Sequence, residues 1–82
     1  MRVMPMPTSK VATISYSLPA AGNVTLAVYN AGGQEVEVLV RAEQPAGMHQ
    51  VTWSAEDVTG GVYFVRLQAG GMVRTHKLTV VR

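Results

Sequence analysis

The sequence predicts an all-β protein, an antiparallel β-sandwich of six to seven strands. Three observations lead to this fold class. The chain has 82 residues, so residues 1–82 fit a single domain. No stretch shows the three- and four-residue apolar spacing of a helix, whereas short runs with apolar residues at every second position recur along the chain. Turn-forming Gly, Pro and Asn residues separate these runs at the intervals typical of a sandwich or barrel.

Six alternating runs are predicted as strands, each bounded by turn-forming residues. Pro19 ends the first run, because proline has no N–H to donate to a sheet ladder. Glycine in Gly32-Gly33 and Gly70-Gly71 permits the positive φ that tight reversals need. The predicted strands are residues 13–18, 23–30, 35–41, 48–54, 62–69 and 72–81.

Residues 1–10 form an extended N-terminal segment that is compatible with a short edge strand. Pro5 and Pro7 suit an extended path and would protect that edge against unwanted pairing. Methionine adapts to irregular surfaces, so Met4 and Met6 could pack on the domain's own sandwich or dock onto a partner subunit.

The apolar faces of the strands predict where the core lies. Two sheets packed on those faces would remove them from water. Trp53 is expected at the centre, because no other side chain in the sequence buries as much area. The expected structural core is Ile14, Tyr16, Leu26, Val28, Val51, Trp53, Tyr63, Val65, Leu67 and Leu78.

The third run alternates less cleanly than the others. Val36, Val38 and Val40 are expected on one face of the strand, and Glu35, Glu37 and Arg41 are expected on the other. Leu39 breaks this pattern and is expected to reach a neighbouring surface.

Few residues are suited to catalysis. The chain has no Cys and a single Asp, which excludes most metal and nucleophile constellations. His49 and His76 lie on separate predicted strands without a carboxylate partner nearby in sequence. The carboxylates of Glu56 and Asp57 are adjacent and point apart, so they do not form an acid–base pair across a cleft. The sequence therefore predicts no enzyme activity, no catalytic residues, no cofactor, no metal and no small-molecule substrate.

Charge and hydropathy exclude two further classes of partner. The net charge of +2 comes from basic residues spread along the chain, too weak a charge for a nucleic-acid footprint. No apolar run approaches the roughly 20 residues that span a bilayer as a helix. Residues 1–7 lack the features of a signal peptide. We expect the chain to be either cytosolic or a part of a longer secreted protein.

Motifs along nearly the whole chain carry a family resemblance. In order, they are VMPMP at residues 3–7, ATISYSLP at 12–19, GNVTLAVYN at 22–30, GQEV at 33–36, LV at 39–40, AGMH at 46–49, VTW at 51–53, GVYFVRL at 61–67 and KLTVVR at 77–82. This ordered set resembles the C-terminal sorting domains of type IX secretion. It is also similar to the Ig-like domain of flagellar hook-capping proteins. The family usually has an aromatic residue at the position of Met4 and Asn at the position of Met6.

The resemblance implies an Ig-like, fibronectin type III-like sandwich without catalytic activity. Such domains direct a secreted protein of a Gram-negative bacterium through an outer-membrane translocon to the cell surface, after export as part of a longer precursor. The expected partners are the proteins of the translocon and the sorting machinery. The ending at residues 80–82 matches a family C-terminus, which favours sorting over hook capping. The residues expected to contact the partner are Val3, Met4, Pro5, Met6, Pro7, Lys77, Val80, Val81 and Arg82.

Two other functions remain compatible with the residues. One is a free-standing structural unit that self-assembles with like subunits into a filament, sheath or surface layer. An exposed Val62 and Phe64 and the Met-rich N-terminal segment motivate it, because that segment could add to a neighbour's sheet edge. The other is a carbohydrate-binding sandwich, which the small number of aromatic residues disfavours.

Overall fold

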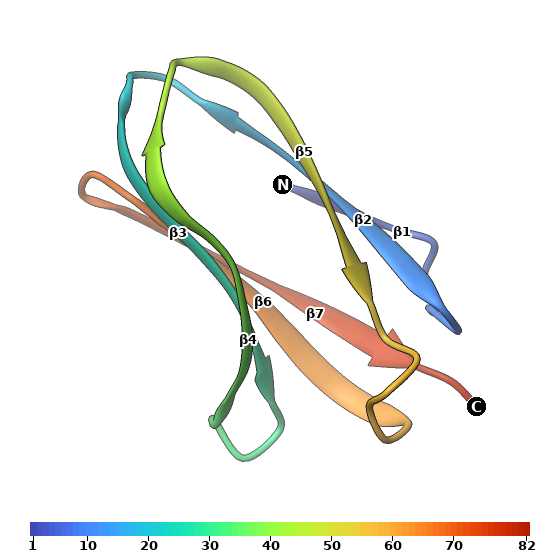
Figure 1. Ribbon diagram of the computed structural model, residues 1–82. Coiled ribbons are helices and arrows are strands. Elements are labelled where there is room, and N and C mark those ends of the chain that lie inside the picture. Colours follow the sequence, from blue (N-terminus) through green and yellow to red (C-terminus); the bar gives the residue numbers. More distant parts are fainter.

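The computed structural model describes residues 1–82 and confirms the all-β sandwich (Figure 1). Each of the six predicted runs is a strand, and the N-terminal segment adds a seventh. The structure contains no helix that could span a membrane. The strands are β1 (Arg2–Met4), β2 (Val11–Leu18), β3 (Gly22–Asn30), β4 (Glu35–Gln44), β5 (Gly47–Ser54), β6 (Gly61–Ala69) and β7 (Met72–Val80).

The strands form two antiparallel sheets that pack face to face. One sheet has three strands in the order β1-β2-β5, and the other has four in the order β4-β3-β6-β7 (Figure 1). β1 contacts β7, so these two edge strands lie on the same side of the sandwich. β4 passes directly into β5 and carries the chain from one sheet to the other on the opposite side.

The core lies between the two sheets and centres on Trp53, of which only 1% is exposed. The Trp53 ring meets the Tyr63 ring edge-on, with their centroids 5.7 Å apart. This geometry is preferred by aromatic pairs. Of the ten residues expected in the core, all except Val51 belong to the buried cluster, and Val51 packs against it half-buried.

β4 differs from the alternation expected for the third run. Its register against β3 shifts twice, between Leu26 and Ala27 and between Val28 and Tyr29. Each shift places an unpaired residue in the strand and reverses which side chains face the core. Glu37 therefore faces Trp53 across the sandwich, and Val36 is exposed. The expected placement of these two side chains was wrong, because strict alternation holds only where the ladder is regular.

Candidate recognition site

The two ends of the chain meet along the β1 and β7 side of the sandwich. Thr8 and Val80 form a parallel bridge, which joins the segment after β1 to the end of β7. We call residues 4–9 together with residues 77–82 the terminal seam. It contains most of the residues expected to contact a partner, and it unites two segments from opposite ends of the sequence.

Thr8 is the residue that joins the two halves of the terminal seam. Its N–H donates to the Thr79 carbonyl, and its own carbonyl accepts from the Val81 N–H, both at 2.8 Å. Its hydroxyl donates to the Pro5 carbonyl at 2.6 Å and thereby holds the turn that follows β1. Thr8 is fully buried, and all of its polar groups have partners. Sequence reasoning missed Thr8, although a hydroxyl residue directly after a proline-rich segment is a candidate for such local bonding.

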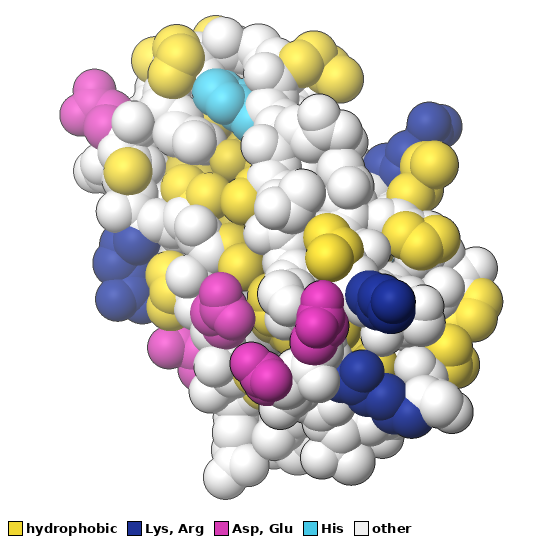
Figure 2. Space-filling model, turned by 45° about the vertical axis from the view of Figure 1, so that its right-hand side comes forward, with side chains coloured by type: hydrophobic (Ala, Val, Ile, Leu, Met, Phe, Trp, Pro, Cys, Tyr) yellow, Lys and Arg dark blue, Asp and Glu magenta, His cyan; other side chains and the backbone are white.

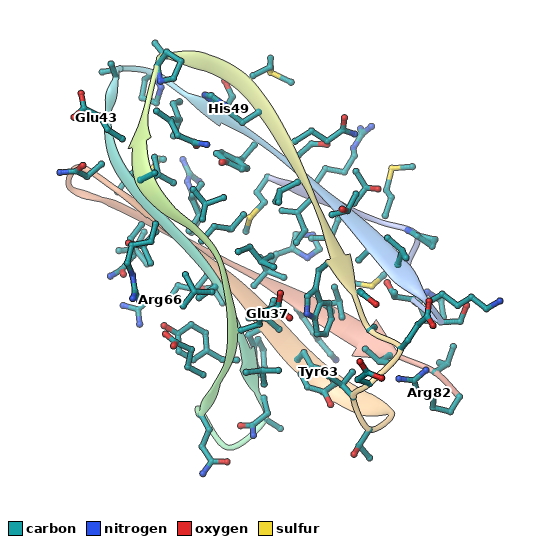
Figure 3. All side chains as sticks on the ribbon, viewed as in Figure 1. Glu37, Glu43, His49, Tyr63, Arg66 and Arg82 are labelled. Carbon is teal, nitrogen blue, oxygen red and sulfur yellow. The ribbon has the colours of Figure 1, made fainter.

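Arg82 has an internal role. Its guanidinium donates hydrogen bonds to the backbone carbonyls of Ala55 and Val58, in the loop between β5 and β6, and to Ser9 at 3.3 Å (Figure 3). The planar guanidinium can serve several carbonyls at once because its donors form a fixed fork. Arg82 thus ties the end of the chain to the domain.

Much of the exposed surface of the terminal seam is apolar, and its exposed polar residues are Ser9, Lys77 and Arg82. Met4, Met6 and Val81 have exposed fractions of 53%, 43% and 41%. By contrast, Val3 and Val80 are buried in the core and cannot contact a partner while the domain is folded. Their expected role in direct recognition stays a prediction, which the burial of both side chains does not favour.

Lys77 lies apart from this apolar surface. It is paired with Phe64 in the β6–β7 ladder and faces the outer side of the four-stranded sheet. Val62 and Phe64, which were expected to be exposed, are half-buried on this outer side. The methylenes of long cationic side chains often cover such apolar surface while the charged group stays in water.

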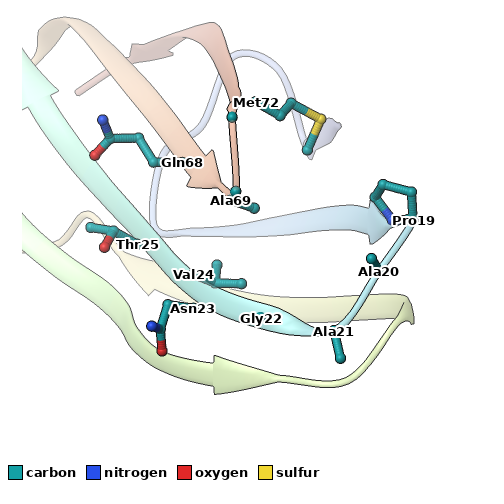
Figure 4. Close-up of a pocket in the computed structure, with 12 residues that line it drawn as sticks. Pro19, Ala20, Ala21, Gly22, Asn23, Val24, Thr25, Gln68, Ala69 and Met72 are labelled. Carbon is teal, nitrogen blue, oxygen red and sulfur yellow. The ribbon is translucent and has the colours of Figure 1, made fainter.

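A hollow lies at the end of the sandwich where the β2–β3 and β6–β7 turns come together (Figure 4). Pro19, Asn23, Gln68 and Met72 are among its lining residues, and most of the others are Ala or Gly. None of the lining side chains is acidic, basic or a histidine. This hollow therefore offers no group that could transfer a proton at neutral pH.

The two histidines make separate contacts within the domain. His49 stacks on Tyr16 with ring centroids 5.4 Å apart, and its Nε2 lies 2.8 Å from the Pro45 carbonyl. The His76 Nδ1 lies 2.8 Å from the Lys77 carbonyl. No group of three or more His, Cys, Asp or Glu side chains could hold a metal ion.

Burial raises the pKa of the Tyr16 hydroxyl, which donates to Gln44 Oε1 at 2.6 Å.

The chain is thus a small β-sandwich module with a largely apolar seam at its surface. The comparison with known families then identifies the module. Residues 2–81 match the secretion system C-terminal sorting domain, so the chain belongs to this family, a sorting signal for type IX secretion. The match supports sorting and gives no support to the self-assembling alternative. No curated protein sequence matches the chain at a significant level.

Proposed function

We propose that the folded domain is recognised through its terminal seam by the outer-membrane translocon and sorting machinery of a Gram-negative bacterium. The domain catalyses no reaction in this process. It directs a longer precursor, of which it is the C-terminal part, to the cell surface. Family membership supports a role in sorting. The bridge between Thr8 and Val80 supports the terminal seam as the recognised surface, because it joins the two segments of the seam.

The bridge matters because it makes recognition depend on folding. The two segments that the resemblance singles out are far apart in the sequence, and they become one surface only when residues 4–9 pair with the end of β7. A partner that binds both segments would therefore distinguish a folded domain from an unfolded one. Arg82 is exposed but binds the domain's own carbonyls, so it is left out of the proposed contacts. The proposed contact residues are the other exposed members of the expected set: Met4, Pro5, Met6, Pro7, Lys77 and Val81.

A reporter fusion tests sorting directly. The chain is fused to the C-terminus of a periplasmic reporter in a host with a type IX system, and surface exposure is measured by protease accessibility on intact cells. We expect the fusion at the surface and the unfused reporter in the periplasm. A wild-type fusion that stays in the periplasm would show that the chain does not act as a sorting signal.

A matched pair of valine variants tests the terminal seam. Val81→Ser removes an exposed apolar side chain from the seam, and Val73→Ser removes one from β7 outside it. Both side chains are exposed, so neither change opens a cavity, and both variants should unfold at the same urea concentration as the wild type. We expect Val81→Ser to lower the surface-exposed fraction of the reporter several-fold, and Val73→Ser to leave it unchanged. Equal sorting by the two variants would contradict recognition at the seam.

A further inference from the structure

The four edge strands of the sandwich are not equally protected against pairing with another chain. Proteins protect such edges with charges, prolines, bulges or very short strands. β1 has only three residues and is followed by prolines. β4 has two register shifts and four charged side chains. β7 carries Arg74 and Lys77, and Thr8 covers its end. β5 has none of these features: its eight residues include no charge and no proline, and its pairing with β2 is regular throughout.

The backbone groups on the open side of β5 can be identified. The Ala55 N–H donates to the Lys10 carbonyl at 2.6 Å, which continues the register of the β2–β5 ladder by one pair. Residues in an antiparallel ladder alternate between those that bond to the partner strand and those that point away from it. By this alternation, residues 47, 49, 51 and 53 bond to β2. The N–H and C=O groups that point to the open side are those of Met48, Gln50, Thr52 and Ser54.

The open side of β5 lies next to a strip of apolar surface. The sheet that contains β5 has one strand fewer than the facing sheet. The inner face of β4 is therefore only partly covered by the opposite sheet. Leu39 and Val40 on β4 and Val51 on β5 are half-buried against the core as a result. In Figure 3, His49 and Glu37 mark the upper and lower ends of the space between β4 and β5. Figure 2 shows hydrophobic side chains at the surface between a histidine and a group of acidic side chains.

Glu37 borders this strip, because its carboxylate accepts from the Trp53 indole, whereas Glu43 points away from it in Figure 3. All five acidic residues of the chain lie on β4 or in the loop that follows β5. The single cation on β4, Arg41, is 3.9 Å from Glu35, and Arg82 is held by carbonyls of that loop. Lys10 also lies beside that loop, because its carbonyl accepts from the Ala55 N–H, and Figure 2 shows basic side chains next to the acidic group. The other basic residues are not on β4, on β5 or in the loop. The acidic residues are Glu35, Glu37, Glu43, Glu56 and Asp57.

We propose that β5 is a docking edge that accepts an extended segment of a partner protein as the missing fourth strand of its sheet. The backbone groups of residues 48, 50, 52 and 54 would supply the hydrogen bonds of strand addition. The segment would place apolar side chains on the strip at every second position, and it would carry Lys or Arg near Glu37, Glu56 and Asp57. This edge lies across its sheet from β1, so the proposal goes beyond recognition at the terminal seam.

A synthetic peptide tests the docking edge. The probe is as long as β5, begins with two Lys residues, and continues with Val at alternate positions and Thr between them. Antiparallel pairing with β5 then places the two Lys residues next to the loop of Glu56 and Asp57. Amide hydrogen exchange of the full chain is measured by NMR with and without the peptide. We expect slower exchange at Met48, Gln50, Thr52 and Ser54, whose N–H groups are otherwise open to water, and little change at the neighbouring residues that bond to β2. Binding should weaken as salt is added, since charges at the surface are screened.

Variants at one position separate backbone pairing from side-chain contact. Gln50→Pro removes an N–H that faces the open side and leaves the ladder with β2 intact. We expect it to abolish peptide binding. Gln50→Ala keeps the N–H and should bind as the wild type does. If Gln50→Pro does not fold, Thr52→Lys places a cation on the same edge and should weaken binding of the cationic probe at least several-fold.

Three outcomes would overturn the proposal. The first is that the peptide does not bind at millimolar concentration. The second is that amide exchange slows at β4 or β7 instead of β5. The third is that exchange at β5 slows when the protein concentration is raised in the absence of the peptide. The last outcome would make a second copy of the chain the occupant. None of them depends on sorting in cells, and a reporter that stays in the periplasm would leave peptide binding at β5 unaffected. The two proposals can therefore fail separately.

Discussion

At the scale of single residues, the most informative contact is the hydrogen bond between the Trp53 indole and Glu37. The indole Nε1–H donates to Glu37 Oε1 at 3.2 Å, and the rest of the tryptophan is buried. A buried indole N–H without a partner costs about 1–3 kcal/mol. We expect Glu37→Ala to lower the free energy of unfolding by about this amount. Glu37→Gln should keep most of the wild-type stability, because the amide oxygen can still accept the indole hydrogen bond.

Urea denaturation followed by Trp53 fluorescence measures this effect. Glu35→Ala is the matched control, because Glu35 is exposed and its 3.9 Å contact with Arg41 is an ordinary surface ion pair. Such pairs contribute about 0–1 kcal/mol. If the alanine variants at residues 35 and 37 lowered the free energy of unfolding equally, the hydrogen bond to Trp53 would contribute no more than the surface ion pair.

Individual residues also show where sequence patterns stop being informative. Trp53 and Leu78 were placed in the core correctly because large apolar side chains in a small domain have few other places to go. Arg82 was expected to face a partner, yet its guanidinium binds the domain's own carbonyls. A terminal arginine looks the same in a sequence whether its partner is internal or external, since the carbonyls it binds lie far away along the chain.

At the scale of elements, the bridge between Thr8 and β7 controls the N-terminal segment. Thr8→Pro removes the N–H that donates to Thr79. We expect residues 1–9 to become sensitive to limited proteolysis, and the Val81 amide to exchange faster, while amides of the β3–β6 ladder stay protected. Thr8→Val is the control, because it removes the hydroxyl and keeps both backbone hydrogen bonds. Unchanged proteolysis of Thr8→Pro would show that β1 alone anchors the segment.

Most strands were predictable to within a few residues, and the failures have a common cause. Alternation specifies which side chains share a face, and this placed β2, β3, β6 and β7 correctly. It carries no information about partner strands, so the order within each sheet and the pairing of Thr8 with Val80 could not be predicted. It also assumes a regular ladder, and the two register shifts in β4 violate that assumption.

At the scale of the whole molecule, stability should fall in alkaline solution. Burial raises the pKa of Tyr16 above its ordinary value of 10.0 in the folded state. As the pH rises past 10, the unfolded chain therefore loses this proton before the folded domain does. The contribution of Tyr16 is present below pH 10 and is lost as the pH rises through the folded-state pKa. We expect the urea midpoint to decline above pH 10.

The variant Tyr16→Phe isolates this contribution. It removes the hydroxyl and keeps the ring that stacks on His49. Urea midpoints of both proteins are compared between neutral pH and pH values above 10. The wild type should lose more stability than the variant over this interval. Parallel declines would assign the alkaline sensitivity to other groups.

The parallel direction of the bridge between Thr8 and Val80 has a mechanical consequence. Tension applied to the two ends of the chain would pull residue 8 and residue 80 in opposite directions along their strands. The two hydrogen bonds of Thr8 would then be loaded in shear and would break together, whereas a hairpin pulled at its ends opens one bond at a time. Resistance to stretching depends on the unfolding rate. The bridge therefore lies in the path along which a domain that is drawn by its ends carries the load.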